Sequence, residues 1–64
     1  RILAIAQGRN GEIGLSSLAS AEQHMLLNNY SDSLRFAKQS ISLLKKNSPG
    51  WLRAKDIEII LTQN

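Results

Sequence analysis

The chain contains no cysteine, one proline and one residue each of tryptophan, tyrosine and phenylalanine. Without cysteine it forms no disulfide bond. So few aromatic side chains provide no stacking ladder for single-stranded nucleic acid. The net charge of +3 is spread along the chain, where Lys45 and Lys46 form the only adjacent basic pair. Such charges are typical of solvated helix surfaces, so we expect no nucleic-acid partner.

Membrane-spanning and targeting segments are also missing from the printed sequence. No apolar run approaches the roughly 18 residues of a transmembrane helix, so we expect no direct membrane insertion. The chain begins at Arg1 rather than methionine, with an apolar segment already under way. This start predicts that residues 1–64 are one small domain cut from a longer protein. Such a domain buries only about 60% of its unfolded surface, so we expect marginal stability.

Residues suited to catalysis or metal binding are equally scarce. His24 is the only histidine, and no further ligand lies at zinc-binding spacing from it. Because a zinc site needs three or four ligands, we interpret His24 as a half-buried packing residue. Gly8, Gly11 and Gly14 lack the preceding strand and the following Gly-Lys-Ser/Thr of a phosphate-binding loop, so they predict a helix break. We expect no catalytic group, metal or cofactor in this segment.

What the sequence does contain is helical periodicity, which predicts an all-α fold. Four helices are expected, at about residues 1–8, 12–28, 30–46 and 49–62. The third has one apolar stripe, formed by Tyr30, Leu34, Ala37, Ile41 and Leu44. Asn29 is the expected cap of this helix and Asn47 the left-handed residue after it, whereas Ser48 and Pro49 begin the fourth. The short connections predict antiparallel neighbours.

The spacing of the helices indicates a repeat. Trp51 begins the last helix 34 residues after Ser17 (51 − 17 = 34), and 34 residues is the period of the tetratricopeptide helix–turn–helix unit. Ala21 and Tyr30 match the signature of that repeat closely. His24 and Asn28 stand where an aromatic residue and a glycine are usual. We therefore predict tetratricopeptide-like antiparallel hairpins, about four helices in a right-handed array.

A closer resemblance covers almost the whole chain and is carried by residues 3–9, 18–22, 33–38 and 48–57. The last run reads Ser-Pro-x-Trp-Leu-Arg-Ala-x-Asp-Ile. These segments resemble the C-terminal tetratricopeptide region of the BepA-like family of bacterial periplasmic zinc metalloproteases. Gln7 and Ser33 depart from the family, where tyrosine and alanine are usual.

The resemblance implies a non-catalytic protein-interaction module in the periplasm. In the family, a membrane-associated zinc peptidase domain with His-Glu-x-x-His precedes the repeats, and the repeats engage outer-membrane assembly partners. A concave surface of successive helices would then bind a protein or peptide. By analogy with the first helices of such arrays, the expected contact residues are Ile5, Arg9, Leu18, Glu22 and Met25.

The last helix carries two apolar stripes. Ala54, Ile57 and Leu61 are enough to dock it on the third helix, which leaves Leu52 and Ile59 as a second stripe for another partner. Trp51 is expected to pack between helices. Two alternatives remain open for the function. One is a tetratricopeptide adaptor with no protease attached, and the other is a small helical oligomerisation module that forms a homo-oligomer.

Overall fold

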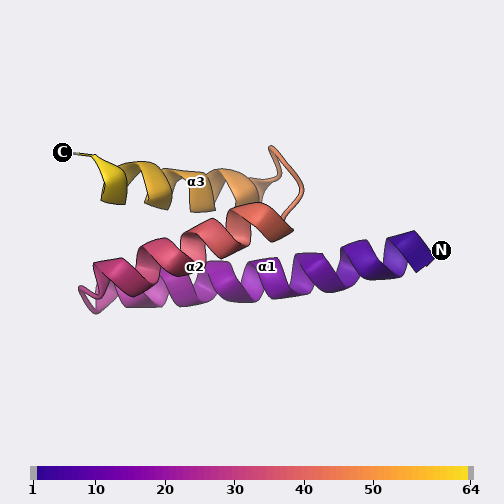
Figure 1. Cartoon of the computed structure of the whole chain (residues 1–64), viewed down its shortest axis with the longest axis horizontal. Coiled ribbons are helices and arrows are strands. Elements are labelled where there is room, and N and C mark those ends of the chain that lie inside the picture. The colour runs from indigo at the N-terminus through magenta and orange to yellow at the C-terminus, as the bar shows by residue number, and fades with distance from the viewer. Residues whose placement is uncertain (1, 64) are drawn as a thin grey trace.

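Three α-helices follow one another in antiparallel order (Figure 1). They are α1 (Ile2–Leu26), α2 (Tyr30–Leu43) and α3 (Pro49–Thr62). The computed structural model describes the backbone of residues 2–63 and the side chains of residues 11–63. The C-terminal half of α1 lies beside α2, and its N-terminal half extends beyond the other helices. The all-α prediction is confirmed, and residues 2–63 contain no strand.

The predicted helix break at residues 9–11 is wrong. Helix α1 continues for 25 residues through Gly8 and Gly11, so three helices stand where four were expected. A glycine inside a helix costs only about 1 kcal/mol relative to alanine. A glycine that ends a helix usually adopts a positive φ, and none of the described glycines does. The spacing of Gly8, Gly11 and Gly14 in the sequence therefore predicted a helix end that the structure does not have.

Small residues form the contact between α1 and α2. The buried positions of α2 are Ser33, Ala37 and Ser40. Ser33 Oγ donates to the carbonyl of Ala21 at 2.7 Å, and Ser40 Oγ donates to the carbonyl of Gly14 at 2.6 Å. The two hydroxyls are therefore satisfied where they are buried. Their small size also allows the helices to approach closely.

This contact corrects the predicted buried stripe of α2. Ala37 lies at its centre, as expected, whereas Tyr30 is exposed and Leu34 and Ile41 are only half-buried. The predicted stripe did not include Ser33 or Ser40, the two serines of α2 that are buried. Here each serine reaches a carbonyl on α1, which makes the serine side of α2 the buried one.

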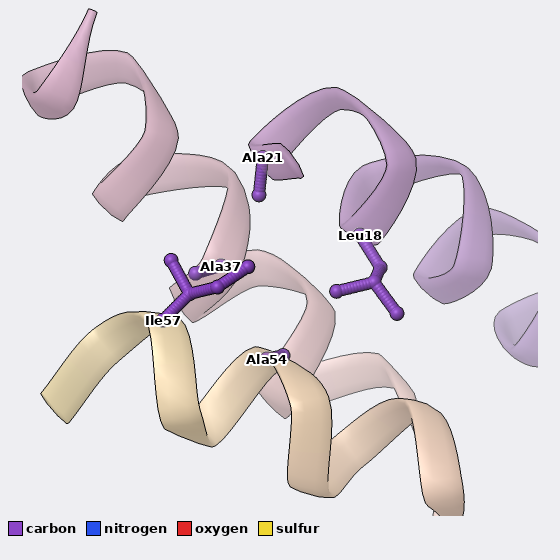
Figure 2. Close-up of a cluster of buried hydrophobic side chains, with 5 residues drawn as sticks. All are labelled: Leu18, Ala21, Ala37, Ala54 and Ile57. Atoms are coloured by element: carbon purple, nitrogen blue, oxygen red, sulfur yellow. The ribbon is translucent and has the colours of Figure 1, made fainter. Parts of the chain in front are cut away.

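Five apolar side chains from all three helices meet at the centre of the molecule (Figure 2). Helix α3 contributes Ala54 and Ile57, and both are buried. The predicted docking stripe of α3 is thus confirmed, with Leu61 packed at its edge. The other members of this cluster are Leu18, Ala21 and Ala37.

The ends of the helices follow the sequence closely, with three exceptions. Helix α1 ends at Leu26, two residues before the predicted end. Ser48 caps α3 by accepting a hydrogen bond from the backbone N–H of Trp51 at 3.4 Å, and Pro49 is the first helical residue. Asn47 has a φ of 68°, as predicted for the residue between α2 and α3. Asn29 stands at the cap of α2, but its side chain makes no capping bond. Helix α2 also ends at Leu43, three residues before the predicted end.

Candidate functional site

A shallow groove of about 450 Å³ lies between the C-terminal part of α1 and α3. These helices run in the same direction, because each is antiparallel to α2 between them in the chain. Each wall contributes three residues at helical spacing (i, i+3, i+4). The lining residues are Glu22, Met25 and Leu26 from α1 and Arg53, Asp56 and Ile57 from α3.

The apolar residues that line the groove range from buried Ile57 to exposed Leu26. Ile57 belongs to the core cluster and Met25 packs against it. The hydroxyl of Ser33 lies 3.8 Å from the sulfur of Met25, so α2 supports this side chain from behind. Leu26 is 84% exposed at the end of α1. A leucine that stands in water beside an apolar groove is a favourable contact for a partner's apolar side chain.

Charged groups sit beside these apolar residues. Arg53 donates from Nε to Glu22 Oε2, an ion pair that bridges α1 and α3. Both side chains remain accessible to water, so the pair contributes at most about 1 kcal/mol to stability. Asp56 forms no ion pair with another residue of the described part of the chain. The groove therefore carries one unbalanced negative charge.

His24 does not line the groove and instead faces α2. Its ring packs on Phe36 with centroids 5.2 Å apart, and Nδ1 lies 2.7 Å from the carbonyl oxygen of Ser20. The prediction of a half-buried packing histidine is confirmed. Within residues 11–63, no three histidine, cysteine, aspartate or glutamate side chains are grouped so that they could hold a metal ion.

The predicted contact residues divide into three sets. Glu22 and Met25 line the groove, whereas Ile5 and Arg9 lie outside the residues whose side chains are described. Leu18 is 7% exposed, so its prediction as a partner contact is corrected. It points into the core beside Ala54 because the α1–α3 contact covers it (Figure 2).

Four groove residues were missed by the sequence analysis, namely Leu26, Arg53, Asp56 and Ile57. Their recurrence at i, i+3 and i+4 in two segments was visible in the sequence. What was not visible is that the two segments face each other. They are about 30 residues apart along the chain and meet only because both pack on α2.

The outer side of α3 is a second exposed apolar region. Leu52 is 49% and Ile59 47% exposed, which confirms that the second stripe has no cover among the described residues. Trp51 is half-buried and its ring lies 5.9 Å from Lys55 Nζ. Trp51 is absent from the buried cluster, so its packing role is only partial.

Among the helices of residues 2–63, none combines the length and the apolar character needed to cross a bilayer.

Comparisons with known proteins found no protein similar to this chain. The chain matches no protein-family model, and searches of curated proteins and of solved structures found no match.

Proposed function

We propose that this chain is a non-catalytic protein-interaction module whose ligand, a short segment of another protein, lies in the groove between α1 and α3. The observation that carries the proposal is the combination of exposed Leu26, half-buried Met25 and unbalanced Asp56 along one groove. Apolar contacts would supply most of the binding energy, and the charges would select the partner.

The repeat spacing supports the same function. In a tetratricopeptide-like arrangement, α1 and α2 form one hairpin and α3 is the first helix of the next unit. Successive first helices then line one concave surface of a right-handed array. In that arrangement the groove between α1 and α3 would belong to this concave surface. Helix α1 is longer than a typical helix of such a unit, and its N-terminal half extends beyond α2.

The resemblance to BepA-like metalloproteases supports a more specific proposal. The module would belong to a periplasmic zinc peptidase and would position substrates or outer-membrane assembly partners. The zinc would then be held by a catalytic domain elsewhere in the protein. This part is tested by the gene sequence upstream of the codon for Arg1. A His-Glu-x-x-His motif is expected there, and its absence would leave a stand-alone adaptor.

Peptide binding is tested by selecting short random peptides from a display library on the immobilised chain. We expect enriched peptides to combine apolar residues with a lysine or arginine, because the groove has an apolar floor and the free carboxylate of Asp56. Binding of a fluorescently labelled enriched peptide is then measured by fluorescence polarisation. Leu26→Lys should weaken it at least about tenfold, equivalent to 1.4 kcal/mol.

Leu27→Lys is the matched control. Leu27 is also an exposed leucine, next in the chain, but it does not line the groove. It should leave peptide affinity within about twofold of wild type, a free-energy change below 0.5 kcal/mol. Enriched peptides that bind both variants equally, or a selection that enriches none, would refute binding in this groove.

A further inference from the structure

Helix α3 contains two charge pairs with the same spacing and the same order. In each, a base precedes an acid by three residues, Lys55 before Glu58 and Arg53 before Asp56. Side chains with this spacing are neighbours on a helix, and opposite charges there attract each other. Lys55 forms its ion pair, with Nζ 3.0 Å from Glu58 Oε1. Arg53 and Asp56, both among the described side chains, form none with each other.

The difference between the two pairs comes from α1. Arg53 donates from Nε to Glu22 Oε2, so its guanidinium is directed across the groove towards the other helix. This leaves the carboxylate of Asp56 without an ion-pair partner among the described residues. The unbalanced negative charge of the groove is therefore a consequence of the contact between α1 and α3, and the charge order of α3 alone would have neutralised it.

We propose that Glu22 is a positioning residue that gives the groove its preference for a cationic side chain, an inference that rests on the function proposed above. Glu22 holds Arg53 away from Asp56, and Asp56 contacts the lysine or arginine of the bound segment. Without the carboxylate of Glu22, the spacing within α3 favours an ion pair between Arg53 and Asp56. The cation of the ligand would then meet a neutral pair.

The two possible partners of Arg53 are close in energy. The side chain of Arg53 is 69% exposed and that of Glu22 36% exposed, so water screens their ion pair. A pair within one helix at this spacing is similarly weak. Removing one carboxylate is therefore enough to redirect Arg53 to the other. Because these side chains lie outside the buried cluster, their substitution should leave the fold intact.

The first test needs no ligand. Asp56→Asn is compared by urea unfolding in the wild type and in a Glu22→Gln background. In the wild type, Asp56 has no ion pair with a described residue to lose. In the Glu22→Gln background it should have gained Arg53. Asp56→Asn should therefore lower the folding equilibrium constant by about twofold more in the Glu22→Gln background than in the wild type.

Arg53→Gln separates this mechanism from direct repulsion between the two carboxylates. Repulsion between Glu22 and Asp56 would also make the two backgrounds differ, but it does not require Arg53. Once Arg53 is replaced, Asp56→Asn should have the same effect with glutamate or glutamine at position 22. A difference that persists, or equal effects while Arg53 is present, would overturn the proposal.

The second test measures selectivity. It uses a peptide enriched on the wild-type chain and a copy in which the lysine or arginine of that peptide is replaced by glutamine. By fluorescence polarisation, the wild type should bind the parent peptide several-fold more tightly than the copy. Glu22→Gln should reduce this preference to less than about twofold, since Arg53 then neutralises Asp56. Adding Arg53→Gln to Glu22→Gln frees Asp56 again and should restore the preference.

Glu12→Gln is the matched control for the change in net charge. It is the same substitution on α1, at an exposed position that does not line the groove, and should keep the wild-type preference. Full preference in Glu22→Gln, no recovery in the double variant, or an equal loss in Glu12→Gln would each overturn the proposal. A wild-type chain that selects no peptide would instead refute the proposed function. The unfolding comparison would still decide whether Glu22 holds Arg53 away from Asp56.

Discussion

Replacing Gly11 or Gly14 by alanine makes the same chemical change three residues apart in α1, and we expect opposite effects on stability. A Cβ at Gly11 would meet no atom within 4 Å. A Cβ at Gly14 would come within 2.7 Å of Leu44 Cγ, 2.8 Å of Leu44 Cδ2 and 3.3 Å of Leu43 Cβ. The two sites therefore differ in packing and not in backbone conformation.

The magnitudes follow from two opposing contributions. Alanine is better than glycine inside a helix by roughly 0.5–1 kcal/mol, which should act unopposed at Gly11. For a domain of this size it corresponds to a rise in Tm of roughly 2–8 °C. At Gly14 the new methyl group would sit well inside the usual carbon–carbon separation of about 3.5–4.0 Å, so Leu44 must move. Overpacking of this kind costs about 1–3 kcal/mol and exceeds the gain in helix propensity.

Thermal and urea unfolding followed by circular dichroism at 222 nm, the usual helix wavelength, would measure both changes. Each glycine variant is also made in a Leu44→Ala background. There the two closest contacts are gone and, of the three nearest, only Leu43 Cβ at 3.3 Å remains. Gly14→Ala should therefore lose most of its cost, and the change in its effect between the two backgrounds is the coupling energy. If Gly14→Ala stabilises the wild type as much as Gly11→Ala, α2 does not end against Gly14. If Gly11→Ala fails to stabilise, α1 is not a continuous helix there.

Two further predictions concern the core and a helix cap. Ala37→Asp should unfold the domain, because an unpaired buried carboxylate costs about 3–5 kcal/mol and a domain of this size has on the order of 3–10 kcal/mol of stability. Gln39→Asp, at an exposed position of α2, should remain helical, and equal Tm values for both would place Ala37 outside the core. Ser48→Ala should lower the free energy of unfolding by about 1 kcal/mol through loss of the α3 cap, and an unchanged urea midpoint would contradict this.

The candidate site was only half visible in the sequence. Glu22 and Met25 were predicted as contacts from the repeat pattern, and both line the groove. Arg53 and Asp56 were missed, since nothing local to α3 indicates which helix its charged side will face. Leu18 was placed on the surface by analogy, but α3 covers it. The spacing of residues within one helix therefore could not predict which residues of distant segments contact each other.

Local rules determined the features that depend on a few neighbouring residues. The all-helical class, the cap at Ser48, the positive φ of Asn47 and the two stripes of α3 all follow from side-chain chemistry within one or two helical turns. Such features form in the same way whatever the rest of the chain does, because caps and stripes depend on short-range hydrogen bonds and helix period.

The tertiary structure alone decided which side of α2 is buried and where α1 continues. A serine is buried only if an acceptor lies within reach, and the carbonyls of Gly14 and Ala21 that accept from Ser40 and Ser33 belong to another helix. The helix interior tolerates Gly11, while Gly14 provides the space into which Leu44 fits. These outcomes depend on how closely two helices approach, which is a property of the packed chain and not of any single segment.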